Sequence, residues 1–96
     1  MATFMTRVEL HDAKSSEDYN ELHIAMEKEG FSRTITSSNG TIYDLPTAEY
    51  YLTGDYTLAS VLEKAKKAAD TIRKKYSAIT SLTTGSTWHG LNITKK

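Results

Sequence analysis

The chain has 96 residues without a single cysteine, and its 12 basic and 12 acidic side chains give a formal net charge of zero. The length suits one domain over residues 1–96, and the lack of cysteine excludes disulfide frameworks and thiolate metal sites. The charge balance excludes a uniformly basic surface, so an RNA partner would need a local basic patch.

The sequence carries no mark of membrane insertion or export. Its apolar runs stay far below the roughly 20 residues that span a bilayer. Residues 1–12 reach acidic side chains early and lack the apolar core of a signal peptide. We therefore expect a cytoplasmic protein without membrane contact.

Residues 6–11 alternate in polarity with a period of two, which predicts a half-buried strand. The residues that share its outward face are Arg7, Glu9 and His11. Asp12 follows at the end of the strand, and residues 13–18 predict a loop that leads into a helix.

An amphipathic helix is predicted next. The apolar positions that recur at the spacing of one helix face are Tyr19, Leu22, His23 and Met26. Gly30 is placed to end this helix in the left-handed conformation, with Phe31 folding back onto its last turn.

The middle of the chain predicts strands joined by tight turns. Residues 31–36 form the second strand, and the Asn-Gly pair at 39–40 is a strong hairpin signal. The return arm covers residues 41–45 and ends at Pro46, which cannot donate a hydrogen bond to a sheet. Residues 48–53 then resume as the third main strand.

A second helix begins after Thr57, which is expected to cap it. The positions that keep the helical period over nearly five turns are Leu58, Val61, Leu62, Ala65, Ala69, Ile72 and Tyr76. Residues 77–83 predict the last strand, and residues 88–91 either pair as a short edge piece or dock on the domain.

The order β-α-β-β-α-β places this chain in the α+β class. The simplest closed arrangement is a ferredoxin-like sandwich, in which two helices cover one face of a four-stranded antiparallel sheet. Right-handed crossovers put the first and third strands in its centre. A core this small gives modest stability, so dimerisation would be a natural supplement.

Asp12, at the end of a central strand, is a candidate catalytic and metal-binding residue. A carboxylate there could hold a divalent cation or polarise a water, although aspartate also serves as a loop or capping residue. His23 and His11 are candidate proton carriers, since the first helix folds back from this end of the strand. Ordinary packing is the competing interpretation for His23, which lies on the apolar stripe.

The open face of the sheet is a candidate protein interface. It is expected to carry Arg7, Glu9, His11, Glu49 and Tyr51. Antiparallel sheets commonly leave one face in water, and aromatic side chains are enriched at interfaces. A dimer interface, a solvated face and a catalytic arrangement are all compatible with this set.

The second helix carries a candidate RNA-binding stripe. The lysines that share one face are Lys64, Lys67, Lys74 and Lys75. Such a stripe has phosphate-binding potential, but basic residues near a helix C-terminus also complement the helix dipole on a solvated exterior.

Residues 6–73 combine the strand-end Asp12, Ser15-Ser16, Tyr19, Met26, Phe31-Ser32, Gly40 and the strand-to-helix run from Leu52 to Leu62. Taken together, these features resemble the GhoS antitoxin family, whose members are ferredoxin-like and similar in shape to the small CRISPR-associated endoribonucleases. The resemblance implies a cytoplasmic, dimeric protein that cleaves a toxin messenger RNA selectively. The first helix of the family is basic, whereas the matching stretch here is acidic.

Two hypotheses from different classes follow. The first is a small cytoplasmic homodimer, antitoxin-like and without a cofactor, that acts as a binding or regulatory module through a protein partner. The alternative is a metal-assisted endoribonuclease that acts on single-stranded RNA with Mg²⁺ or Mn²⁺ at Asp12.

Overall fold

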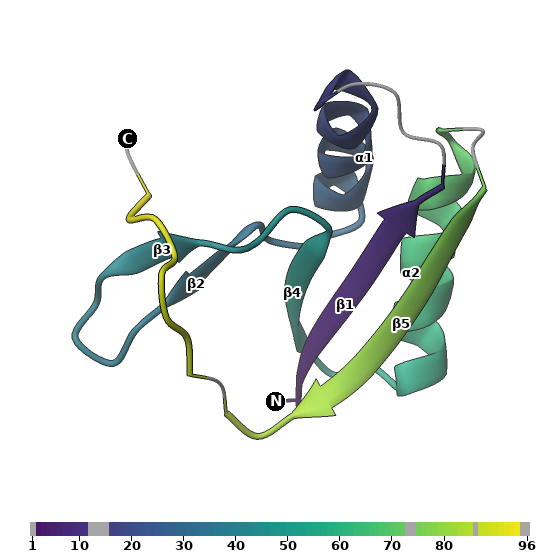
Figure 1. The fold of residues 1–96 in the computed structure, drawn as a ribbon. Helices are drawn as coiled ribbons and strands as arrows, with labels where there is room; N and C mark the ends of the chain where they lie inside the picture. The colour runs from purple at the N-terminus through teal and green to yellow at the C-terminus, as the bar shows by residue number, and fades with distance from the viewer. Residues whose placement is uncertain (1, 12–15, 73–74, 86, 95–96) are drawn as a thin grey trace.

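The computed structural model describes residues 2–11, 16–72, 75–85 and 87–94, and in these ranges the chain forms five strands and two helices (Figure 1). In chain order they are β1 (Ala2–Leu10), α1 (Ser16–Lys28), β2 (Thr34–Thr36), β3 (Ile42–Asp44), β4 (Glu49–Gly54), α2 (Leu58–Asp70) and β5 (Tyr76–Thr83). The α+β class is confirmed.

The strands are divided between two sheets in the described part of the chain. An antiparallel sheet has the order β4-β1-β5, and β2 pairs with β3 in a separate two-stranded sheet. The predicted single four-stranded sheet is therefore wrong. Of the predicted second strand, residues 31–36, only Ser32 forms a bridge to β4, where Ser32 and Tyr51 exchange backbone hydrogen bonds of 2.7 and 2.9 Å.

Local hydrogen bonds mark the point where the predicted second strand leaves the main sheet. The Ser32 hydroxyl accepts a hydrogen bond from the Thr34 N–H at 3.1 Å. This backbone donor is therefore bonded to a side chain and not to the backbone of a neighbouring strand. Leu45 N–H then bonds to the Arg33 carbonyl at 2.8 Å. The hairpin turns away from β4 at this point, as Figure 1 shows.

Both helices pack on the same face of the main sheet and bury one core. Its members are Phe4, Val8 and Leu10 from β1, Leu22 and Met26 from α1, Phe31 from the segment before β2, Tyr50 and Leu52 from β4, and Val61, Ala65, Ala68 and Ala69 from α2. The apolar stripes predicted for both helices are thus confirmed over most of their length. Ile35 and Leu45 are also buried, but they lie in the hairpin outside this core.

The ends of the helices follow their local signals in part. Gly30 adopts φ +97°, which a residue with a side chain rarely takes, and Phe31 N–H bonds back to the Met26 carbonyl at 3.1 Å. Thr57 caps α2 and accepts the Ser60 N–H at 3.1 Å. The helical period predicted to continue to Tyr76 is wrong, because α2 ends at Asp70 and Tyr76 begins β5.

The segment after Gly85 docks on the hairpin. Asp44 N–H bonds to the Asn92 carbonyl at 2.8 Å, and Thr94 N–H bonds to the Ile42 carbonyl at 2.9 Å. β3 therefore contacts β2 on one side and the C-terminal segment on the other. Neither described helix has the length and apolar character needed to cross a membrane.

Candidate functional site

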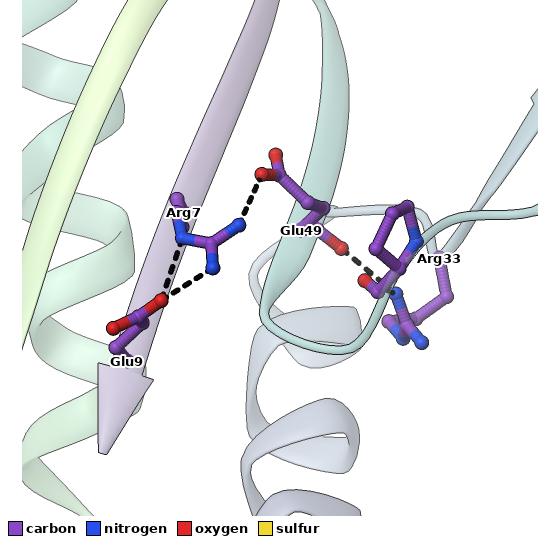
Figure 2. A network of polar contacts seen from close by, with 5 residues as sticks. Arg7, Glu9, Arg33 and Glu49 are labelled. Carbon is purple, nitrogen blue, oxygen red and sulfur yellow. Dashed lines mark hydrogen bonds and ion pairs between the residues drawn. The ribbon is translucent and has the colours of Figure 1, made fainter. Parts of the chain in front are cut away.

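A cluster of charged side chains lies on the face of the main sheet that the helices leave open. We call Arg7, Glu9 and Glu49 the Arg7 cluster (Figure 2). Arg7 Nη1 donates to Glu49 Oε1 at 2.8 Å, Nε donates to Glu9 Oε1 at 2.8 Å, and Nη2 also contacts Glu9. Arg7 and Glu49 stand opposite each other in the β1–β4 register, so strand pairing alone brings them together.

The guanidinium of Arg7 is a cation at any physiological pH. Its hydrogen bonds to Glu49 and then to Glu9 raise the pKa of Arg7 above its ordinary value. The cluster holds two carboxylates and one guanidinium, so it carries a net negative charge. It suits recognition of a charged or polar protein surface better than proton transfer or phosphate binding.

Arg33 holds the backbone of Glu49, one of the three residues of the Arg7 cluster. Its Nη1 donates to the Glu49 carbonyl and to the Pro46 carbonyl, both at 2.9 Å (Figure 2). Its guanidinium also lies 5.6 Å from the centre of the Tyr50 ring. Sequence reasoning missed Arg33, because an arginine inside a predicted strand gives no signal of a clamp across a turn.

The open face continues beyond the Arg7 cluster. Tyr51 lies opposite Met5 on the same face as Glu49. Ile79 of β5 stands opposite Arg7 and is 63% exposed. His11 Nε2 lies 2.8 Å from the Ser77 hydroxyl, beside this face.

His23 of α1 lies on the helix-covered side of the sheet and is half-buried. Its Nδ1 lies 2.6 Å from the Tyr50 hydroxyl. Burial, and then the charge of Arg33, lower the pKa of His23 to about 4, and burial raises the pKa of Tyr50. At neutral pH the imidazole is uncharged, and the phenol can donate to Nδ1 when the ring proton is on Nε2.

The three candidate catalytic residues are therefore not seen to gather in one place. His11 bonds on the open side of the sheet, whereas His23 packs against Tyr50 on the helix-covered side. Asp12 lies outside the described residues. Within those that are described, no three His, Asp or Glu side chains lie close enough together to hold a metal ion.

The predicted lysine stripe is partly neutralised. Lys64 and Lys67 place their Nζ atoms 4.0 and 3.8 Å from the two carboxylate oxygens of Glu29, which directly follows α1. Lys75 is exposed beyond the end of α2, and Lys74 lies outside the described residues. Lys64 and Lys67 therefore lie beside the C-terminal end of α1, on the helix-covered side of the sheet, which separates these two lysines from the Arg7 cluster.

A hollow of about 500 Å³ was missed by sequence reasoning. It lies between the hairpin, the end of β5 and the C-terminal segment, and its aromatic walls are Tyr43, Tyr51 and Trp88. The described residues that line it are uncharged, with hydroxyl and amide groups among them. It exists because the hairpin leaves the main sheet, which no local pattern announced.

Neither a comparison with protein-family models nor one with the sequences of curated proteins gives a match for this chain. The function must therefore follow from the geometry of the molecule.

Proposed function

We propose that this protein is a small cytoplasmic homodimer that binds and regulates another protein through its open sheet face. The Arg7 cluster beside exposed Ile79 is the observation that carries this proposal. Arginine and apolar side chains are typical of interface centres, and charged groups are typical of their rims. Because strand pairing and Arg33 hold the cluster in place, a partner would meet an ordered surface.

The proposal includes an antitoxin-like role on a ferredoxin-like fold. The strand order β4-β1-β5 with two helices on one face supports that fold, with the Ser32 bridge in the place of the fourth strand. Element order also supports the resemblance to GhoS antitoxins. A regulatory protein of this kind needs a stable recognition surface and no cofactor.

The binding role is favoured over the endoribonuclease alternative by three observations. The pKa of His23 is too low for efficient proton transfer at neutral pH. Lys64 and Lys67 both form ion pairs with Glu29, which reduces the positive charge that they offer to a phosphate. The hollow of about 500 Å³ offers no described cation to a phosphate.

Site-specific photo-crosslinking in cells tests the role of the open face. A crosslinking amino acid at Thr53, which is exposed on β4, should capture a specific protein. Adding the Arg7→Ala substitution to this variant should abolish that product. The same amino acid at Glu21, exposed on α1, is the matched control and should capture nothing that depends on Arg7. Products that are unchanged by Arg7→Ala would contradict the proposal.

An RNA assay tests the alternative directly. The purified protein should leave single-stranded RNA intact with Mg²⁺ or Mn²⁺, at levels equal to those with excess chelator. Cleavage that is lost with both the chelator and Asp12→Ala would overturn the binding role in favour of a nuclease.

A further inference from the structure

The outer edge of β5 presents a row of backbone groups to solvent. β1 pairs along the inner side of β5 from Leu10↔Tyr76 to Thr3↔Thr83, and no strand of the described chain pairs with the outer side. Figure 1 shows β5 at the margin of the sheet. An unpaired edge of this kind is a template for another strand.

The alternation of an antiparallel ladder identifies the outward-facing groups. His11 N–H bonds to the Lys75 carbonyl at 2.7 Å, so Lys75 and every second residue after it turn their backbone groups toward β1. The residues that turn their N–H and C=O groups outward are therefore Tyr76, Ala78, Thr80 and Leu82.

β5 lacks the features by which proteins normally protect an edge strand. It contains no charged residue and no proline, and its register with β1 runs without a bulge. It also carries two of the large exposed apolar side chains of the described chain, Ile79 at 63% and Leu82 at 57% exposure. An edge that is both unprotected and apolar is expected to be covered.

We propose that two copies of this chain pair their β5 edges antiparallel, about a two-fold axis at Ile79. Outward-facing residues must then bond to each other, so Ala78 pairs with Thr80 of the second copy and Tyr76 pairs with Leu82. Ile79 stands opposite Ile79 in a pair without mutual hydrogen bonds, where side chains approach most closely. This arrangement rests on the homodimer proposed above and supplies its interface.

The occupant is a second copy because the strand is complementary to itself. In this register both exposed aliphatic side chains are covered, Ile79 by its equivalent and Leu82 by Tyr76. An axis at Thr80 would leave Ile79 opposite Ser81 instead. The nearest charged residue, Lys75, falls opposite Thr83, so no like charges meet across the axis.

Edge pairing also extends the open face. Arg7 stands opposite Ile79 in the β1–β5 register, so the two copies would place one Arg7 cluster on each side of the central isoleucine pair. The two three-stranded sheets become continuous, and a partner would meet a symmetric surface rather than a single cluster.

Disulfide trapping tests the axis, and the natural absence of cysteine makes the assay clean. Facing residues in such a pair have Cα atoms about 4.5 Å apart, within the range that a disulfide bridges. Under mild oxidation Ile79→Cys should form a covalent dimer about tenfold or more faster than Ile24→Cys. Ile24 lies on α1 with 57% exposure and is the matched control.

Sedimentation of charged variants separates this inference from the homodimer itself. The unmodified protein should be a dimer, Ile79→Lys and Ile79→Glu should each be monomers, and their mixture should dimerise again. Ile24→Lys should stay dimeric. A dimer that persists in Ile79→Lys and does not crosslink at position 79 would overturn edge pairing while the homodimer stands. A protein that is monomeric throughout would overturn both.

Discussion

Polar side chains on the two faces of the main sheet differ in their exposure to solvent. On the helix-covered face, Thr6 is fully buried and bonds to Thr80, and Tyr50 is fully buried and bonds to His23. On the open face, the Arg7 cluster makes more numerous polar contacts, but they are exposed to solvent. A lost partner is costly where the remaining group is buried and cheap where water replaces it. The most conspicuous polar cluster is therefore the one that the fold needs least, which leaves it available for recognition.

The largest expected effect contrasts two adjacent tyrosines. Tyr50→Ala should lower the free energy of unfolding by about 3–5 kcal/mol, because it empties a buried site and removes the partner of His23. Tyr51→Ala, on the open face, should lower it by about half as much or less. Urea titration followed by circular dichroism measures both, and equal losses would contradict the contrast between the faces.

A smaller effect depends on pH and on His23. Since the folded pKa is about 4 and the ordinary value is 6.5, the unfolded chain binds a proton first as the pH falls. Stability from this group is therefore complete above about pH 6.5 and declines to a plateau near pH 4. The loss should be about 2 kcal/mol, since the half-buried ring keeps some contact with water.

The variant His23→Gln isolates that contribution. Glutamine retains a hydrogen-bonding group near Tyr50 but does not titrate, so its stability should fall less steeply between pH 6.5 and pH 4. Denaturant titrations at several pH values measure the difference between the two proteins. Parallel stability profiles would show that His23 is not held neutral by the fold.

The smallest expected effect comes from the Arg7 cluster. Arg7→Ala should lower the free energy of unfolding only slightly, because water replaces the lost partners, and the difference should shrink further in 1 M salt. The same variant should lose the crosslinked partner described above. A loss of stability as large as that of Tyr50→Ala would mean that the cluster serves the fold, against the distinction between the two faces.

Features that depend on neighbouring residues could be predicted from the sequence. The apolar stripe through Leu22 and Met26, the left-handed Gly30 and the Thr57 cap each follow from a local pattern. The outward face of β1 also follows, because alternation is a property of every strand. These signals set the class and the order of elements.

Other features depend on contacts between distant segments. The Thr34 N–H bonds to the Ser32 hydroxyl at the point where the chain leaves β4, and no strand propensity encodes this contact. Tyr76 fits the period of α2, and its hydroxyl does donate to Asp70 at 2.8 Å, but it does so from β5. Burial and this bond raise the pKa of Tyr76 to about 12. The sequence pattern thus anticipated the packing of Tyr76 near the helix and misassigned its element.

The single bridge between Ser32 and Tyr51 has a consequence for motion within the native state. The hairpin has its own buried residues, Ile35 and Leu45, which do not belong to the main core. Its backbone amides are therefore expected to exchange with solvent at a lower free energy than those of β1, without global unfolding. Because the hairpin also forms one wall of the hollow of about 500 Å³, such local opening would change the width of that hollow while the open face stays rigid.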